Sequence, residues 1–493
     1  MTTIDWAARS RELAIDGRAV IDGRRVDASE GATIPVISPG SLTHLADLAA
    51  GTERDVDLAA DRARQAFDDG RWSRLDAAER GRVLVRLADL MMEHLDELAL
   101  LETLDSGKPI AQTRVVDVPG AAATFRWYGE LADKRFDEIP STPPGSTALV
   151  RRVPLGVVGA IVPWNYPLEI AAWKLAPALA SGNSVVLKPA TETSLTALRL
   201  ADLALEAGIP AGVLNVVPGR GSTVGGRIAR HPGIDVLAFT GSTAVAKQLM
   251  VDAGTSNMKR VALEAGGKSS NLVFADADLG LAAAKAAFGA FYNQGQVCSA
   301  NSRILVERSA HDEFVQLLAE ASRAYEPSDP LAGADGNGSL ISRAHADDVG
   351  AAIALAAGDG TLVSGGERVT ITGSDAYLRP AIVTGLAADH DLHRVEVFGP
   401  LVAVLPFDGE DEAVRLANAT DYGLAASLWT TDLARAHRLS ERLVAGTVSV
   451  NTVDALGLTT PFGGFRQSGF GRDLSRHALD NYTDWKTTWF QWA

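Results

Sequence analysis

The sequence predicts an α/β protein with two doubly wound lobes and a small β element. At 493 residues, the chain is too long for a single hydrophobic core. Strand-like apolar runs alternate with turns and helical patterns from residue 148 to 275, and the alternation resumes between 275 and 460. This order is typical of parallel sheets covered by helices. Residues 482–490 alternate like one more strand, which supplies the β element.

The part of the chain before residue 148 has a different pattern. Residues 1–50 read as short strands and turns, with a hairpin at 18–23 and an edge segment at 34–40. Apolar side chains then follow a helical period from 55 to 105, and a further helix is expected near 121–136. We therefore expect helices to dominate this part.

The sheet of the first lobe is predicted from short, continuous apolar runs. Parallel strands that are buried on both faces have this character. The runs occupy residues 157–162, 184–188, 213–217, 236–239, 261–264 and 271–274. Because helical patterns and turns separate them, they predict repeated strand–helix units.

The composition predicts an acidic, metal-free cytoplasmic enzyme. A net charge of -15 without a cluster of Lys and Arg argues against a nucleic-acid partner. A single cysteine excludes an internal disulfide and a cysteine-rich zinc site. No uninterrupted apolar run approaches the roughly 20 residues of a membrane span, so we expect no membrane contact either.

That single cysteine, Cys298, is the first candidate for chemistry. It lies in a polar segment between an Ala-rich helical run that ends near Phe291 and a strand-like run at 303–306. Reactive groups are often presented in such loops. The alternative is a small buried apolar side chain. A nucleophilic thiol also needs a base and a donor for an oxyanion.

Other candidates follow predicted strands. Glu264 ends one strand and precedes two glycines, and Asn165 follows another. A surface Glu and a turn-forming Asn are the alternatives. The glycine-rich run at 219–225 is one residue too long for the dinucleotide fingerprint. The turn at 240–242 is better placed, because it opens a helix whose amides could face a pyrophosphate.

Taken together, the motifs resemble the aldehyde dehydrogenase superfamily over nearly the whole chain. They are Pro163-Trp164-Asn165-Tyr166-Pro167, Lys188-Pro189, Phe239-Thr240-Gly241-Ser242, Leu263-Glu264-Ala265-Gly266-Gly267-Lys268, Gln294-Gly295-Gln296-Val297-Cys298, Glu396-Val397-Phe398-Gly399-Pro400 and Pro461-Phe462-Gly463-Gly464-Phe465. A set in this order is far more specific than any one motif. Asp473 departs from the family, which frequently has Glu there.

The resemblance implies a role for each catalytic residue. Cys298 would attack the aldehyde, and the Asn165 amide with the Cys298 backbone N–H would hold the oxyanion. Glu264 would activate the water that releases the acid. The retained Glu264 favours hydrolysis over transfer of the acyl group to CoA. A non-enzymatic protein on the same fold is the remaining alternative.

The resemblance also implies a site for NAD or NADP. Lys188 would bind the adenosine ribose and also counts among the catalytic residues. Glu396 would bind the nicotinamide ribose, Phe398 would support the nicotinamide, and Ser242 would contact the pyrophosphate. Further cofactor contacts are expected from Ile161, Trp164, Thr191, Gly221, Gly225, Phe239, Thr240, Gly241 and Leu263. Thr191 is neutral where many NAD-preferring relatives have Glu, so we expect tolerance of NADP.

Narrower features resemble the γ-glutamyl-γ-aminobutyraldehyde dehydrogenases and other aminoaldehyde dehydrogenases of polyamine catabolism. Tyr166, Trp173, Tyr292 and Phe462 would form an aromatic cage for a cationic substrate. Ordinary core aromatics are the alternative. A broad-specificity aliphatic, betaine or semialdehyde dehydrogenase also remains open.

The expected domains follow from this assignment. Residues 1–135 and 154–264 would form the NAD(P)-binding domain, and 265–468 the catalytic domain. Residues 136–153 and 469–493 would form an oligomerisation element. A terminal strand with exposed aromatics suggests pairing with another subunit, so we expect a homo-oligomer, either a dimer or a homotetramer.

Overall fold

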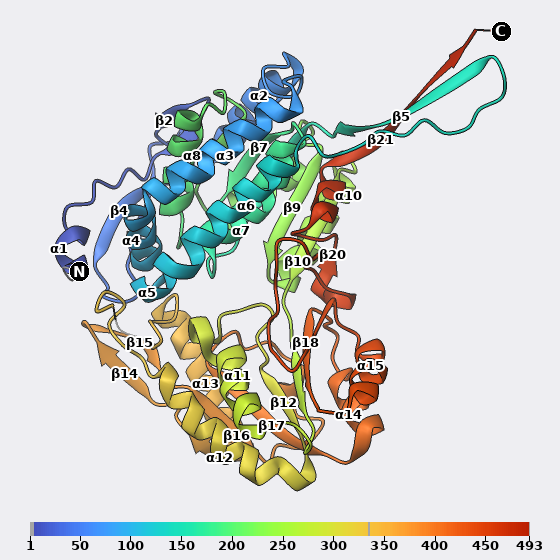
Figure 1. The fold of residues 1–493 in the computed structure, drawn as a ribbon. Coiled ribbons are helices and arrows are strands. Elements are labelled where there is room, and N and C mark those ends of the chain that lie inside the picture. The colour runs from blue at the N-terminus through green and yellow to red at the C-terminus, as the bar shows by residue number, and fades with distance from the viewer. Residues whose placement is uncertain (1–3, 334–335, 493) are drawn as a thin grey trace.

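The computed structural model describes residues 4–333 and 336–492. It confirms an α/β fold with two large, mainly parallel sheets, one in each lobe (Figure 1). The chain passes from the first sheet to the second between Ala265 and Ser270. None of the helices in the described residues has the length and apolar character needed to span a bilayer.

The first sheet has a parallel centre and antiparallel edges. In spatial order its strands are β2 (Arg24–Val26), β1 (Ala19–Ile21), β8 (Leu214–Val216), β7 (Ser184–Lys188), β6 (Val157–Ile161), β9 (Val236–Gly241), β10 (Arg260–Ala265) and β20 (Gly469–Phe470). The predicted hairpin near residue 20 and the central strands are confirmed, but the run at 271–274, which the sequence predicts for this sheet, forms a strand (Ser270–Val273) of the second sheet. The edge strand β20 comes from beyond the second lobe.

Helices cover both faces of this sheet, which explains its continuous apolar runs. Val158 and Ala160 of β6 belong to one core with α7, while Val157 and Ile161 belong to a second core with α10. The helices and helical turns of this lobe are α1 (Trp6–Ser10), α2 (Glu53–Asp68), α3 (Ala77–Glu93), α4 (Leu95–Ser106), α5 (Ile110–Gln112), η1 (Thr113–Asp117), α6 (Val118–Leu131), α7 (Pro167–Ala180), α8 (Leu195–Ala207), η2 (Gly221–Gly225), α9 (Gly226–Arg230) and α10 (Thr243–Thr255).

The second sheet is parallel except for its edge strand β13. Its spatial order is β13 (Thr361–Ser364), β16 (Ala381–Thr384), β17 (Leu401–Phe407), β12 (Arg303–Glu307), β11 (Ser270–Val273), β18 (Ala425–Trp429) and β19 (Thr447–Val450). Its helices and turns are α11 (Leu279–Phe291), η3 (Tyr292–Gly295), η4 (Arg308–Ala310), α12 (His311–Ser322), η5 (Arg323–Tyr325), α13 (Arg343–Asp359), η6 (Asp391–His393), α14 (Gly409–Ala417) and α15 (Leu433–Arg442). The later turns η7 (Arg466–Ser468) and η8 (Arg476–Asn481) contact β10 of the first sheet, and Leu479 of η8 belongs to the core of the first lobe.

Small two-stranded sheets complete the fold. They pair β3 (Thr33–Ile37) with β4 (His44–Ala49), β14 (Arg368–Ile371) with β15 (Ser374–Leu378), and β5 (Ser146–Pro154) with β21 (Thr483–Gln491). The β5–β21 pair forms an antiparallel arm that projects from the first lobe (Figure 1). Its exposed aromatics include Trp485 at 44%, Trp489 at 54% and Phe490 at 49%.

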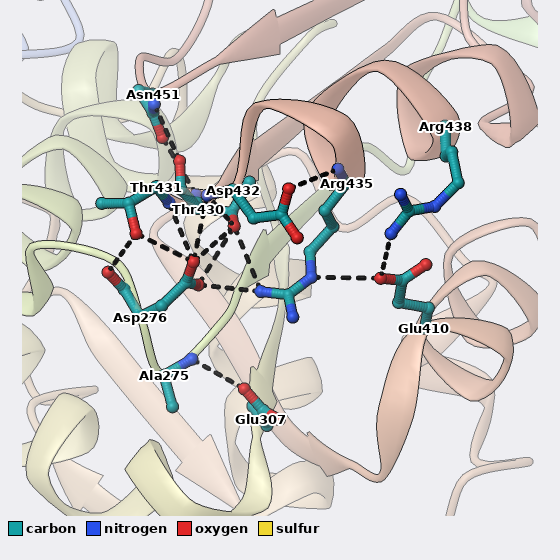
Figure 2. Close-up of polar contacts among 10 residues, drawn as sticks. All are labelled: Ala275, Asp276, Glu307, Glu410, Thr430, Thr431, Asp432, Arg435, Arg438 and Asn451. Atoms are coloured by element: carbon teal, nitrogen blue, oxygen red, sulfur yellow. Dashed lines mark hydrogen bonds and ion pairs between the residues drawn. The ribbon is translucent and has the colours of Figure 1, made fainter.

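A polar network ties together the loops at the carboxyl edge of the second sheet (Figure 2). Asp276, after β11, accepts hydrogen bonds from the backbone N–H groups of Thr431 (3.0 Å) and Asp432 (3.1 Å) after β18. It also accepts from the Thr430 hydroxyl at 2.8 Å and from the Arg435 guanidinium at 2.9 Å. One carboxylate therefore fixes two loops and the start of α15.

Candidate active site

A cavity of about 320 Å³ opens at the carboxyl edge of the first sheet. From β6 the chain builds the sheet outward through β7 and β8, then returns to add β9 on the other side of β6. Such a reversal of strand order leaves a crevice between the two strands in which ligands bind. The cavity is lined by Pro163, Trp164, Asn165, Thr240, Gly241, Ser242, Glu264, Gly266, Cys298, His345, Glu396, Val397 and Phe398.

Two consecutive glycines allow the two lobes to meet at this cavity. A Cβ on Gly266 would lie 2.1 Å from Glu396 Oε2, and one on Gly267 would lie 2.3 Å from the Cys298 carbonyl oxygen. The Gly267 N–H donates to Glu396 Oε1 at 2.9 Å. The sequence between Glu264 and Lys268 is therefore shaped by the close approach of the Cys298 and Glu396 loops.

Cys298 and Glu264 lie close enough to influence each other's ionisation. Burial, and then the Glu264 carboxylate, raises the pKa of the Cys298 thiol well above its usual value. Burial also raises the pKa of Glu264 to about 7. A carboxyl group with this pKa can accept and return a proton near neutral pH.

The turn before Cys298 is held by Asn165. Its side-chain Nδ2 donates to the Gln296 carbonyl at 3.0 Å, and Asn293 donates to the Asn165 carbonyl at 3.1 Å. Asn293 and Gln294 adopt left-handed φ values of 49° and 57°, which give the tight turn. Asn165 Nδ2 carries a second hydrogen that its bond to Gln296 does not use.

A buried ion pair lies behind Glu264. Lys174 Nζ on α7 is 2.5 Å from Asp473 Oδ2, and both side chains are almost fully buried. The Lys174 charge lowers the pKa of Glu264, whereas the Asp473 charge raises it. The departure from Glu at position 473 therefore still places a carboxylate beside the candidate base.

A second group of predicted residues lies along the same sheet edge. Lys188, at the end of β7, donates from Nζ to the Pro189 carbonyl at 2.7 Å, and burial lowers its pKa to about 8. The Thr191 hydroxyl donates to the Gly219 carbonyl at 3.0 Å. A Cβ on Gly225 would lie 3.6 Å from both Ile161 and Lys188.

The remaining cofactor candidates belong to β9, β10, the start of α10 and η2. Ser242 caps α10 by accepting from the Val245 N–H at 3.4 Å. Phe239 and Leu263 are buried neighbours in register, so they support the cavity floor from the core. Gly221 begins η2, the helical turn that contains Gly225.

The four predicted cage aromatics do not line this cavity. Trp173 and Phe462 pack edge to face at 5.5 Å, with exposures of only 8% and 2%. Tyr292 packs against Phe288 at 4.9 Å. Tyr166 has the Lys108 ammonium 3.5 Å from its ring centroid. Tyr166 and Cys298 both pack against the core that contains Trp173 and Phe462.

Among the residues that line the cavity, His345 lies outside every motif identified in the sequence. His345 lies in the first turn of α13, in a segment without a recognised motif, yet its ring lies 5.6 Å from the ring of Trp164. The Ser342 cap indicates the helix start, because its hydroxyl accepts from the His345 N–H at 3.1 Å. The meeting of His345 with Trp164 depends on the tertiary fold, so no local signal could reveal it.

Known proteins with this arrangement are similar over their full length. The chain is 49% identical over 485 residues to the NADP/NAD-dependent aldehyde dehydrogenase PuuC of Escherichia coli, covering 98% of this chain and 97% of that one. A mutant of the indole-3-acetaldehyde dehydrogenase AldA of P. syringae, solved with NAD+ and IAA, superposes with a TM-score of 0.98, at 49% identity and 99% coverage of both chains.

A third protein gives the same result. The γ-glutamyl-γ-aminobutyraldehyde dehydrogenase of Burkholderia cenocepacia superposes with a TM-score of 0.97, at 49% identity and 99% coverage of both chains. The sequence model described as "Aldehyde dehydrogenase family" matches residues 26–488, which include the β6 turn, Glu264, Cys298 and the Glu396 loop. The resemblance predicted from the motifs is confirmed: the chain belongs to the aldehyde dehydrogenase family.

Proposed function

We propose that this protein oxidises an aminoaldehyde to the carboxylic acid through a thioester on Cys298. The observation that carries the proposal is the meeting of the Cys298 thiol, the Glu264 carboxyl group and the Asn165 amide at one cavity wall. A nucleophile, a base and an oxyanion donor are what covalent oxidation of an aldehyde requires.

The steps follow from the chemistry of these groups. The thiol proton passes to solvent, directly or through Glu264, and leaves a thiolate that attacks the aldehyde carbon and forms a thiohemiacetal. Asn165 Nδ2–H and the Cys298 backbone N–H donate to its oxyanion. Removing the Asn165 donor should raise the barrier by about 2.7–4 kcal/mol, as at other oxyanion holes. Once the C–H hydride has left, the carbon is a thioester. Glu264 takes a proton from water, hydroxide adds, and the acid leaves as the thiol re-forms.

NAD or NADP accepts the hydride when it is bound in the cavity. Lys188 would hold the adenosine ribose, Glu396 the nicotinamide ribose and Phe398 the nicotinamide ring. The residues present fit this role, because the Glu396 carboxylate is fixed by the Gly267 N–H at the cavity wall. The name of the E. coli relative, NADP/NAD-dependent aldehyde dehydrogenase PuuC, includes both cofactors, and the P. syringae enzyme was solved with NAD+.

We assign the substrate to the ω-amino or ω-acylamino aldehydes, such as 4-aminobutyraldehyde or γ-glutamyl-γ-aminobutyraldehyde. The name of the B. cenocepacia protein supports this class. One face of Tyr166 already meets the Lys108 ammonium, so a substrate cation would use the remaining aromatic faces. Nearby, burial raises the pKa of Glu169 to about 8, and an adjacent cation would favour its ionised form.

Rapid-mixing kinetics with a panel of aldehydes test the proposal. Cys298→Ala should form no acid yet bind NAD normally, and Glu264→Gln should accumulate a thioester with a burst of reduced cofactor. Near-normal turnover of Cys298→Ala would refute the mechanism. A requirement for CoA would identify an acyl-CoA-forming enzyme. A clear preference for indole-3-acetaldehyde over aminoaldehydes would refute the substrate assignment.

We also propose that the β5–β21 arm mediates self-association. Trp485, Trp489 and Phe490 expose apolar surface on a projecting strand, and an uncovered strand of this kind is prone to aggregation. A second subunit covering the arm would remove that surface from water. The domain limits and the cytoplasmic location expected from the sequence stay predictions.

A further inference from the structure

His345 contacts the loop that carries two of the proposed cofactor ligands. Its Nε2 lies 2.8 Å from the carbonyl oxygen of Phe398. A carbonyl oxygen only accepts, so Nε2 must carry a hydrogen and donate it. Burial lowers the pKa of His345, while Phe398 and Asp348 oppose the shift, so the ring is neutral at pH 7.

The backbone that receives this hydrogen bond is in an unusual conformation. Phe398 has a φ of 58°, a left-handed value that bulky side chains rarely adopt. Such a conformation persists only when surrounding contacts enforce it. The next residue, Gly399, is in close contact with α13, because a Cβ there would lie 2.7 Å from the Val349 methyl groups.

Aromatic packing fixes the same loop from the cavity side. The ring of Trp164 lies 5.2 Å from Phe398 at 87°, and 5.6 Å from His345 at 65°. Both rings therefore meet Trp164 edge to face, while His345 holds the Phe398 backbone. The conformation of this cavity wall depends on contacts from β6 and α13 together.

We infer that His345 is a positioning residue, which holds Phe398 and Glu396 in place by donating to the Phe398 carbonyl. This inference rests on the proposed function, in which that loop binds the nicotinamide half of the cofactor. Without the donor, the carbonyl is left unpaired and the left-handed backbone loses a restraint. The loss should affect cofactor binding more than aldehyde binding, because the predicted cage aromatics do not line the cavity that His345 and Phe398 share.

The test compares His345→Leu, which cannot donate, with His345→Gln, whose side-chain amide can. Steady-state kinetics give KM for NAD and for the aldehyde, and calorimetry gives Kd for NAD. We expect His345→Leu to raise KM and Kd for NAD roughly tenfold, the effect of one lost buried hydrogen bond. The aldehyde KM should change less than about twofold, and His345→Gln should recover most of the loss.

Arg343→Gln is the matched control, because Arg343 is an exposed residue in the same turn of α13. It should leave KM for NAD, KM for the aldehyde and Kd for NAD unchanged. Unaltered NAD binding in His345→Leu would overturn the inference. Equal losses in the Leu and Gln variants would overturn it too, since hydrogen-bond donation would not matter. If the unsubstituted protein bound neither NAD nor NADP, the proposed function itself would fail.

Discussion

At the scale of single residues, burial decides the ionisation of the reacting groups. The Cys298 thiol and the Glu264 carboxyl group both have raised pKa values, with burial as the largest cause in each case. At neutral pH the thiol therefore stays protonated before substrate arrives, whereas Glu264 is shared between its neutral and ionised forms. The thiolate must be generated by proton transfer as the reaction proceeds, and it is not stored in the resting protein.

The pKa of Glu264 predicts how deacylation depends on pH. The carboxyl group is neutral below about 7 and ionised above it, and only the carboxylate can take a proton from water. Deacylation measured by rapid mixing should therefore slow about tenfold per pH unit below that pKa. Glu264→Gln should deacylate slowly, at a rate that does not fall in this way as the pH is lowered. If the deacylation rate of the variant fell over the same pH range and by the same factor, Glu264 would be excluded as the base.

Trp173 provides a test of substrate charge. Trp173→Leu keeps apolar bulk in a site that is only 8% exposed but removes the aromatic face. KM should rise for 4-aminobutyraldehyde roughly threefold more than for butyraldehyde, if the ring contacts the cation. Trp127→Leu, in a partly buried aromatic pair with Tyr128, serves as the control. Equal increases in KM for both aldehydes in Trp173→Leu would show that Trp173 contributes only packing.

Thr191 provides a test of cofactor choice. Its neutral hydroxyl already donates to Gly219, so no charge at this position repels a 2′-phosphate. Thr191→Glu should lower kcat/KM for NADP about tenfold or more while NAD use changes little. The neighbouring residue Glu192 is exposed. The kcat/KM of Glu192→Gln for NADP shows whether the Glu192 charge already disfavours this cofactor. Equal losses of kcat/KM for NAD and NADP in Thr191→Glu would contradict the proposed role of Thr191 in cofactor choice.

At the scale of elements, the second lobe depends on loops that polar contacts hold together. Asp276 accepts from both backbone and side-chain donors after β18, and Arg435 joins it to Glu410 of α14. These bonds satisfy the first N–H groups beyond a buried strand, which would otherwise lack partners. The network is therefore structural, at an edge distinct from the active-site cavity.

Replacing this carboxylate should destabilise the protein without altering its chemistry. Asp276→Ala leaves several donors unpaired and should lower stability by about 2–3 kcal/mol, seen as a lower thermal midpoint. Glu320→Ala breaks a pair with Arg323 whose side chains are 69% and 74% exposed, and it should change the midpoint very little. Similar midpoints for the two variants would show that the network contributes no more than a surface ion pair.

Elements with a strong local pattern could be predicted from the sequence, and the others could not. The buried strands β6, β7 and β9 are continuous apolar runs, so their positions and their parallel pairing could be predicted from the sequence. Cys298, Glu264 and Asn165 could be predicted as one site because their motifs occur in the order typical of the family. The strand β20, Gly469–Phe470, is too short to carry a pattern and exists only because it pairs with β10. His345 was missed for the same reason, since its partners are distant in sequence.

At the scale of the whole molecule, the β5–β21 arm exposes several large aromatic side chains. Tyr482 is fully buried and its carbonyl accepts from Leu155 and Asn183, so a truncation should spare it. Removing residues 485–493 should yield smaller particles in light scattering, because the exposed aromatic strand is lost. Lys486→Ser on the same strand is the control. An unchanged oligomer after truncation would show that the arm is dispensable.

The pairing of β20 with β10 also has a consequence for biosynthesis. The strands from β6 to β10 leave the ribosome before any of the second lobe, and N-terminal units generally fold first. The partner of the β10 edge, however, is translated only after the whole second sheet. During elongation that edge presents unpaired N–H and C=O groups, which can recruit a strand from another nascent chain. We therefore expect the β10 edge to be most open to pairing with another chain between the translation of residue 265 and that of residue 470.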